Sequence, residues 1–248
     1  MSKIAADPTH PRYQSLLMRH RLEVAEQKGM LAGSALIAHG RGEAFDYLIG
    51  EQTIPSALQA TRQALAYLLA AQKPVISVNG NVVALAGKEI LTLAHHLRCP
   101  VEVNIFYRTP ERMEALLSHL QEIKQQEQLD VTILGAEPDA RIPGLEGPRA
   151  NCVNAGIFES DVILVPLEDG DRCEALVAMG KTVIVIDLNP LSRTAQMASV
   201  TIVDELSRVI NNMNNLLESS EQISLSHSYD NQEIVQQSLE HILTFFVS

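Results

Sequence analysis

Residues 161–190 read DVILVPLEDGDRCEALVAMGKTVIVIDLNP, and this stretch decides the fold class of the chain. Two short runs rich in Val and Ile, 162–166 and 183–187, flank a segment at 172–179 whose apolar residues recur at helical spacing. Strands that are almost continuously apolar are typical of a sheet buried on both faces. A strand, a helix and a second strand in this order predict a parallel βαβ unit.

The same alternation extends over most of the chain. Further strand-like runs are 75–79, 101–106, 131–134 and 200–203, and further helical segments are 14–28, 56–72, 87–97, 110–127 and 205–217. The pattern predicts an α/β protein with a Rossmann-like, mostly parallel sheet, helices on both of its faces and an N-terminal helical segment. Residues 1–216 are predicted to form one catalytic domain. Within it, residues 36–53 have few periodic features and are predicted to be a strand followed by a long functional loop.

Residues 217–248 are predicted to extend this domain as a linker and a C-terminal helix. The segment contains no Lys or Arg, and its first half, ESSEQISLSHSYDNQ, is polar. Apolar residues then recur at near-helical spacing, at Ile234, Val235, Leu239, Ile242 and Phe246. This spacing predicts an amphipathic helix that docks on the domain or on a partner subunit.

The composition indicates a globular protein whose partners are small molecules. Of its 248 residues, 46% are hydrophobic and 20% are charged, and the formal net charge is -11. An acidic chain of this kind is not expected to bind nucleic acid or the anionic surface of a membrane. The amino terminus lacks an apolar region, and no run of about 18 apolar residues occurs, so neither a signal peptide nor a membrane span is predicted. The expected location is therefore the cytoplasm.

Polar residues follow the carboxyl ends of four predicted strands. These segments are 79–81, 104–108, 168–172 and 187–190. Asn, Asp, Gly and Pro in any one of them could serve only the turn and the cap of the next helix. Because ligands of open α/β sheets bind beyond the carboxyl ends of the strands, the four segments together favour a ligand crevice.

The common nucleotide-binding loops are incomplete in this chain. Residues 40–42 read Gly-Arg-Gly and begin a GxGxxG pattern, but Phe45 stands where the third glycine belongs. Residues 180–182, Gly-Lys-Thr, resemble the end of a P-loop but lead into a strand, whereas a P-loop opens a helix. Gly180 is instead predicted to terminate the preceding helix. A nicotinamide-dependent dehydrogenase is therefore disfavoured.

Arginines are the remaining candidates for holding phosphate groups. Arg41 lies between two glycines, which permit close approach of a ligand to the backbone. His39 and Glu43 add titratable groups to the same segment. Arg19 and Arg193 are further candidates, because a guanidinium can direct two N–H groups at one phosphate.

Longer motifs occur in a fixed order along the chain. They are KPVISVNGN (73–81), EVNIFYRTPERM (102–113), PDARIPGLE (138–146), DVILVPLEDGDRCEALVAMGK (161–181) and DLNPLSRTA (187–195), preceded by HPRY at 10–13. In these motifs the chain resembles the archaeal phosphopantothenate synthetases, the 4-phosphopantoate:β-alanine ligases of coenzyme A biosynthesis, up to about residue 216. The segment from about 217 exceeds the expected family pattern. The resemblance implies a homodimeric α/β enzyme that uses ATP to join 4-phosphopantoate to β-alanine, and that releases 4'-phosphopantothenate, AMP and pyrophosphate.

The resemblance also implies site residues. ATP is expected to contact Arg19, Arg41, Asp187, Leu188, Asn189, Arg193, Thr194, Asp204 and Glu205. The family usually has Asn at the last of these positions, and a carboxylate there lacks the amide donor. Arg41, His39 and Arg193 are the candidate catalytic residues. The two other substrates are then left with Asn79, Asn81, Asn104, Arg108, Arg141 and Arg172.

A magnesium ion would share the charge of the ATP phosphates. Asp169 and Asp171 are its candidate ligands, and capping of the following helix is the alternative role for both. The alternative function for the whole chain is a non-catalytic nucleotide-binding or regulatory subunit.

Overall fold

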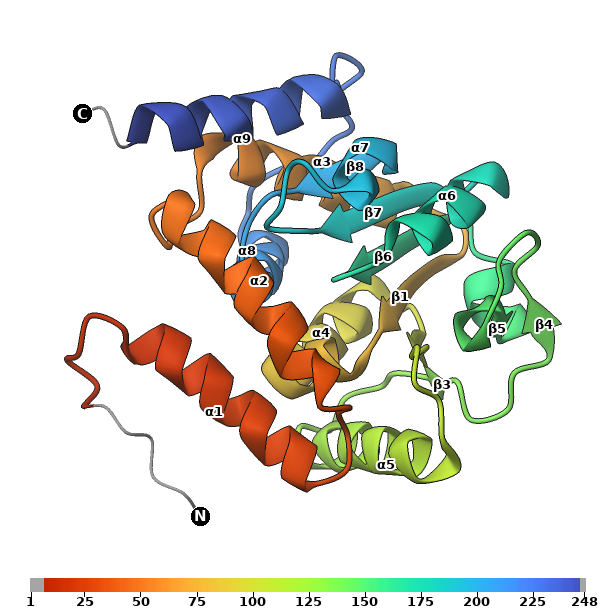
Figure 1. The fold of residues 1–248 in the computed structure, drawn as a ribbon. Coiled ribbons are helices and arrows are strands. Elements are labelled where there is room, and N and C mark those ends of the chain that lie inside the picture. Colours follow the sequence, from red (N-terminus) through yellow and green to blue (C-terminus); the bar gives the residue numbers. More distant parts are fainter. Residues whose placement is uncertain (1–6, 246–248) are drawn as a thin grey trace.

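The computed structural model describes residues 7–245 (Figure 1). Its helices are α1 (Tyr13–Gln27), α2 (Ser34–Leu48), α3 (Pro55–Ala70), α4 (Gly80–Leu97), α5 (Pro110–Gln126), α6 (Gly170–Ala178), α7 (Arg193–Met197), α8 (Leu206–Glu218) and α9 (Asn231–Phe245), with short helical turns η1 (Pro148–Ala150) and η2 (Asn154–Phe158). Its strands are β1 (Pro74–Val78), β2 (Val101–Val103), β3 (Ile133–Leu134), β4 (Ala140–Arg141), β5 (Asn151–Cys152), β6 (Val162–Pro166), β7 (Thr182–Ile186) and β8 (Val200–Ile202). No helix of the described residues is long and apolar enough to cross a membrane.

Six parallel strands form the main sheet, in the order β3-β2-β1-β6-β7-β8. Numbered along the chain, these six strands have the order 3-2-1-4-5-6, which is that of dinucleotide-binding Rossmann folds. The predicted α/β sheet is confirmed. The order reverses between β1 and β6, so the crevice used by ligands in such sheets is expected beyond the carboxyl ends of these two strands.

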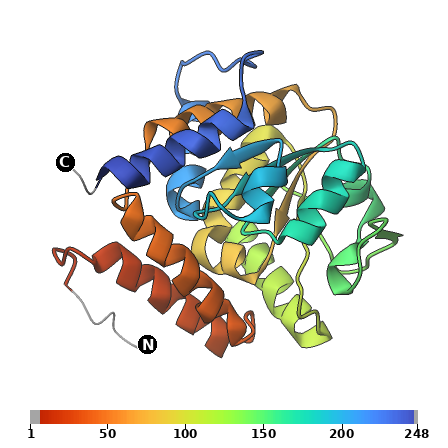
Figure 2. The ribbon, with the colours of Figure 1, turned by 45° about the horizontal axis from the view of Figure 1, so that its top comes forward.

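The sheet is covered on both faces, as predicted. Alternate residues of a strand point to opposite faces, so Leu164 and Ile184 pack under α3, α4, α5 and α8. Their neighbours Ile163 and Val183 pack under α6 and the β4–β5 hairpin. Figures 1 and 2 show these two layers on either side of the sheet. Burial on both faces explains why the strands read as continuous apolar runs.

Helix α4 begins at Gly80, earlier than the predicted start at 87. The side chain of Asn79 accepts a hydrogen bond from the N–H of Val82, which caps the helix at the end of β1. The first two turns of α4 are mostly apolar and therefore lack the amphipathic pattern that indicates a helix in the sequence. At the end of α6, Gly180 has a φ of 79°, which confirms the predicted terminating glycine.

The prediction of a strand and a loop at residues 36–53 is wrong, because α2 occupies most of this segment. Two glycines lower its helix propensity by about 1 kcal/mol each relative to alanine. Tertiary contacts outweigh this cost: Glu43 pairs with Arg19 on α1, and Asp46 pairs with Arg208 on α8. Both acidic side chains are buried. Helices α1 and α2 lie side by side in both ribbon views (Figures 1 and 2).

The predicted C-terminal helix is confirmed as α9, and it docks on the domain itself, against α3, α7 and β8. Asn231, its first residue, accepts a hydrogen bond from the N–H of Thr201 on the edge strand β8 at 2.6 Å. The same side chain donates to the carbonyls of Ala195 and Ala198. The helix therefore protects the open edge of the sheet. Phe246, the last residue of the predicted apolar stripe, lies outside the described residues.

Candidate active site

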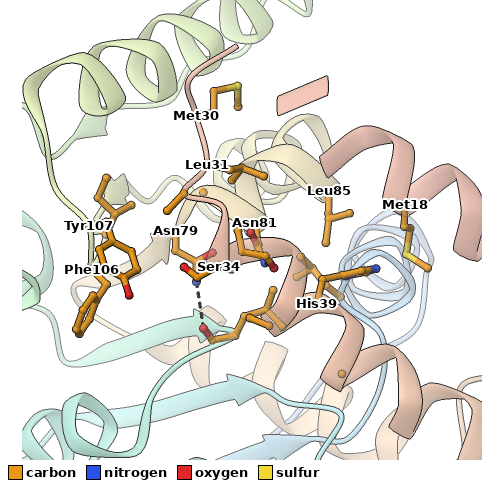
Figure 3. Close-up of a pocket in the computed structure, with 18 of the residues that line it drawn as sticks. Met18, Met30, Leu31, Ser34, His39, Asn79, Asn81, Leu85, Phe106 and Tyr107 are labelled. Carbon is orange, nitrogen blue, oxygen red and sulfur yellow. Dashed lines mark hydrogen bonds between the residues drawn. The ribbon is translucent and has the colours of Figure 1, made fainter. Parts of the chain in front are cut away.

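A pocket of about 260 Å³ lies where the strand order reverses, beyond the ends of β1 and β6 (Figure 3). Asn79 follows β1, Leu167 follows β6 and Leu188 follows β7, and all three line it. Helix α2 forms a further wall. In Figure 3, Phe106 and Tyr107 lie at one end of the pocket, and His39 and Met18 lie at the other. The crevice predicted at the strand ends is present.

Five of the residues expected from the sequence line this pocket: His39, Asn79, Asn81, Leu188 and Glu205. They come from α2, from the start of α4 and from the segments after β7 and β8. The carboxyl ends of parallel strands meet at one edge of the sheet, which brings together the four residues that follow strands. His39 reaches the pocket from α2. The remaining expected residues lie outside the lining.

The side chains of Asn79 and Asn81 are used by the protein itself. Nδ2 of Asn79 donates to the carbonyl of Leu167 at 3.0 Å and thereby joins the ends of β1 and β6. Nδ2 of Asn81 donates to the carbonyl of Ala35 on α2 at 3.1 Å. Both amides therefore hold walls of the pocket.

Gly80, between these two residues, permits the close packing of α4 on the chain before α2. A Cβ atom at this position would lie 2.6 Å from Cδ2 of Leu31 and 3.0 Å from the carbonyl oxygen of Met30. Gly80→Ala is therefore expected to lower the free energy of unfolding by about 1–3 kcal/mol, measured by urea denaturation.

Gly40→Ala is the matched control for this substitution. Gly40 lies inside α2, and a Cβ atom there would meet nothing within 4 Å. Alanine should raise the free energy of unfolding by about 0.5–1 kcal/mol through its helix propensity. Equal effects of the two substitutions would contradict the packing assigned to Gly80.

Arg19 and Arg41 lie on helices beside the pocket. Arg19 donates to both carboxylate oxygens of Glu43, with Nε at 3.0 Å and Nη2 at 2.8 Å. Burial alone would raise the pKa of Glu43, but hydrogen bonds from Tyr47 and Arg19 hold it below its ordinary value. Arg41 is exposed on α2 and has no ion-pair partner among residues 7–245. Its guanidinium is free to meet an anion.

The loop after β7 is held by its own polar groups. Asp187 accepts hydrogen bonds from the hydroxyl of Ser192 and from the N–H of Asn189 at 2.9 Å. Burial raises the pKa of Asp187. The hydroxyl of Thr194 donates to the carbonyl of Glu168 at 3.1 Å, which ties this loop to the one after β6.

The two candidate metal ligands are both paired with arginines. Asp169 caps α6 by accepting the N–H of Arg172, and it lies 2.8 Å from Nη1 of Arg149. Asp171 lies 2.8 Å from Nη1 of Arg193, which is exposed. No group of three or more His, Cys, Asp or Glu residues that could hold a metal ion occurs in the described part of the chain. In this arrangement the two aspartates act as a helix cap and as an ion-pair partner.

A second set of acidic side chains lies beside the pocket, near α8. Arg208 donates to both Asp46 and Asp204, and so joins α2 to the segment after β8. The Glu205 side chain caps α8 by accepting the N–H of Arg208 at 3.1 Å. Burial raises the pKa of both Asp204 and Glu205. Glu205 thus places a buried carboxyl group at the wall of the pocket.

Arg149 lines the pocket, although the sequence analysis did not select it. Its Nη1 lies 2.7 Å from Oε1 of Glu168, whose side chain is fully buried. Glu168 also pairs with Arg172, which is completely buried and donates to the hydroxyl of Ser77 on β1. Nδ2 of Asn104 donates to the backbone carbonyl of Arg149 at 3.3 Å. Arg172 and Asn104, two expected substrate ligands, therefore support Arg149 from behind.

The remaining expected ligands lie away from the pocket. Arg108 donates to the carbonyls of Gly135 and Ala136, and Arg141 on β4 donates to Asn151. Residue type alone does not show that Arg149 lines the pocket while Arg108 and Arg141 do not. Arg149 lies in the short turn η1 between β4 and β5, and the position of a residue in such a turn cannot be deduced from periodicity.

A Rossmann-type sheet with a partly apolar pocket at its reversal point, lined by a few charged groups, defines a small-molecule enzyme or binding protein of the α/β class. A family model described as phosphopantothenate/pantothenate synthetase matches residues 56–245. The chain belongs to this family. The match reaches the end of α9, so the expectation that the segment from 217 exceeds the family pattern is wrong.

Proteins named 4-phosphopantoate–β-alanine ligase are similar to this chain over most of its length. The protein of Thermococcus onnurineus is 49% identical over 240 residues, which cover 94% of this chain and 90% of the relative. The protein of Methanosarcina mazei is 46% identical over 239 residues, which cover 94% of this chain and 92% of the relative. The protein of Methanospirillum hungatei is 44% identical over 237 residues, which cover 94% of this chain and 95% of the relative.

Proposed function

We propose that this protein joins 4-phosphopantoate to β-alanine with cleavage of ATP, and that it releases 4'-phosphopantothenate, AMP and pyrophosphate in coenzyme A biosynthesis. The observation that carries the proposal is the match to proteins named as ligases over 94% of the chain. A non-catalytic nucleotide-binding subunit is a weaker alternative, because the relatives that match over this length carry the name of an enzyme.

The reaction requires an activated carboxylate, because oxide is a very poor leaving group. In the AMP-forming route the carboxylate of 4-phosphopantoate attacks the α-phosphorus of ATP, and pyrophosphate leaves. The amine of β-alanine then attacks the acyl adenylate, and AMP leaves. An enzyme promotes both steps chiefly by positioning the reactants and by offsetting the developing charge.

We place ATP on the side of the pocket formed by α2 and the segments after β7 and β8. Leu188 and Glu205 line this side, and Arg41 is an unpaired cation on α2. Arg193 would have to leave its exposed partners Asp171 and Glu174 to reach a phosphate group. Exposed ion pairs of this kind are weak, so breaking them costs little free energy.

We propose that His39 is the base that accepts a proton from the ammonium group of β-alanine. Its Nε2 is buried and has no hydrogen-bond partner in the described part of the chain, and the side chain lines the pocket. Burial lowers the pKa of His39, which favours the neutral imidazole at pH 7. A neutral ring nitrogen can take up the proton that must leave before the amine can attack.

Magnesium is expected to accompany ATP, but the carboxylates of Asp169 and Asp171 do not fit it in this arrangement. Both are engaged by arginines, and one caps a helix. We therefore assign no catalytic step to a protein-held metal ion.

We also propose that the protein is a homodimer that works in the cytoplasm. Large apolar side chains are exposed near the pocket, namely Ile37 on α2 with 69% exposure and Phe106 with 56%. Light scattering after size exclusion tests the assembly, and a monomer at micromolar concentration would contradict it.

Product analysis tests the proposed reaction. Chromatography of a mixture of the protein, ATP, 4-phosphopantoate and β-alanine is expected to show AMP, with pyrophosphate in equal amount. Formation of ADP and orthophosphate would exclude the adenylate route. ATP binding without turnover would instead support the regulatory alternative.

A further inference from the structure

Two arginines at one side of the pocket have an unsatisfied donor each. Arg112 on α5 and Arg149 in η1 both line the pocket, and Nε of each is buried without a hydrogen-bond partner among residues 7–245. Buried N–H groups in folded proteins are nearly always paired, so each such case calls for an explanation. An oxyanion bound in the pocket would supply the missing acceptors.

The guanidinium of Arg149 is occupied along one edge and open along the next. Nη1 lies 2.7 Å from Oε1 of Glu168, and Nη2 donates to Oε2 of the same residue at 3.2 Å. Nη1 also donates to Asp169 at 2.8 Å. These contacts use the edge formed by Nη1 and Nη2. The neighbouring edge, formed by Nε and the other hydrogen of Nη2, can hold two oxygens of a phosphate or carboxylate.

The position of Arg149 is rigidly defined before any ligand binds. Its side chain is 10% exposed, and Glu168 behind it is held in turn by the fully buried Arg172. Asn104 donates to the carbonyl of Arg149 at 3.3 Å and so fixes the backbone. A donor that is fixed in advance loses little conformational entropy when it binds an anion.

The local charge indicates how large this anion is. Arg149 and Arg172 are balanced by Glu168 and Asp169, which leaves Arg112 without an ion-pair partner in the described residues. The N-terminus of α4 adds about +0.5 charge, since the first N–H groups of a helix have no partner within it. The excess of roughly +1.5 is close to the charge of about -1.5 to -2 on a phosphomonoester at pH 7. The negative charge of a triphosphate would be far larger than this local positive charge.

Uncompensated charge distinguishes the two sides of the pocket. Next to α2 and α8, Glu43 and Asp46 are paired with Arg19 and Arg208. Beside Arg149, the two buried Nε donors have no partner among residues 7–245, and the first turn of α4 adds positive charge. A phosphate is therefore attracted to the side of Arg149.

We infer that Arg149, Arg112 and the first turn of α4 form the subsite for the phosphate of 4-phosphopantoate, an assignment that rests on the proposed function. Arg149 and Arg112 would bind it directly. Glu168 and Asn104 would act as positioning residues for Arg149. This subsite would make the enzyme select phosphopantoate over unphosphorylated pantoate.

Two variants test the subsite without removing the buried charge balance. Arg112→Gln leaves the network behind Arg149 intact, and Arg149→Lys keeps a cation against Glu168 but lacks the Nε edge. Each is expected to lower kcat/KM for 4-phosphopantoate by about 10- to 100-fold, as expected for one or two lost charge-assisted hydrogen bonds. The KM for ATP and the kcat/KM for unphosphorylated pantoate should change by less than about twofold. If Arg149→Lys does not fold, as judged by circular dichroism, Arg112→Gln decides the matter.

Arg98→Gln is the matched control, because Arg98 is exposed at the opposite end of α4. Its selectivity should equal that of the wild type. An equal loss with phosphopantoate and pantoate, a selective rise in the KM for ATP, or no change in either variant would overturn the assignment.

Calorimetric titration of the protein with 4-phosphopantoate alone separates the subsite from the reaction. Binding that is weakened about 10- to 100-fold in Arg112→Gln would support the subsite even if the wild-type protein formed no AMP, in which case only the proposed function fails. Turnover by the wild type with unchanged binding in Arg112→Gln would overturn the subsite and leave the function intact.

Discussion

Arg172→Met is expected to lower the free energy of unfolding by about 3–5 kcal/mol, because it leaves part of a buried ion-pair network without its partner. Arg172 is completely buried, and it joins Glu168 to the hydroxyl of Ser77 on β1. Methionine fills a similar volume but cannot donate to the fully buried carboxylate of Glu168. The midpoint of urea unfolding, measured together with the m-value, gives the change.

Arg193→Met is the control for this substitution, since Arg193 also pairs with side chains of α6. Its partners Asp171 and Glu174 are exposed, as is Arg193 itself, so water replaces the lost contacts. Its unfolding midpoint should equal that of the wild type. The double variant Glu168→Gln/Arg172→Met should lose less stability than the sum of the two single variants, because the two residues share one interaction. Additive losses would show that Arg172 acts through packing alone.

His39→Gln is expected to lower kcat by about 10²- to 10⁴-fold, the usual contribution of a general base. Glutamine retains a polar side chain of similar length, but it cannot take up a proton near neutral pH. The pocket and α2 should be unchanged, because His39 is half-buried and its Nε2 has no partner in the described residues. Steady-state turnover at saturating substrates measures the effect, and wild-type kcat would remove His39 from the mechanism.

The pH dependence of kcat distinguishes a base from a residue that only shapes the pocket. Burial lowers the pKa of His39 below its ordinary value of about 6.5, so the neutral and active form should persist to pH values below that. The rate should then fall as the pH decreases through the lowered pKa, and this limb should be absent in His39→Gln. His96→Gln, at an exposed position near the end of α4, should retain both the rate and the limb.

Much of the fold follows from the chain taken by itself. The apolar runs at 75–79, 162–166 and 183–187 became β1, β6 and β7, because a strand covered on both faces needs apolar residues at every position. Helices α3, α5 and α8 begin within a residue of their predicted starts, where Pro opens the first two and Glu205 caps the third. These signals are local, and tertiary packing did not change them.

Helix α2 was decided by packing instead. Its two glycines and weak periodicity point away from a helix, yet Glu43 and Asp46 are buried against arginines of α1 and α8. The partners of these two ion pairs are separated by 24 and by 162 positions in the sequence, so neither pair leaves a local signal. The strand predicted at 101–106 likewise ends at Val103, because Asn104 turns to donate to the carbonyls of residues 149 and 151.

The sequence by itself determined the sheet, the edge at which ligands gather and the family. Only the tertiary structure decided which polar groups face the pocket and which ones support them. The sequence analysis selected Arg172 as a ligand and not Arg149, but Arg172 is enclosed behind Glu168 while Arg149 lines the pocket. The physical reason is that the direction of a side chain depends on its long-range partners, and a charge is buried only where the fold brings its counter-charge within hydrogen-bonding distance.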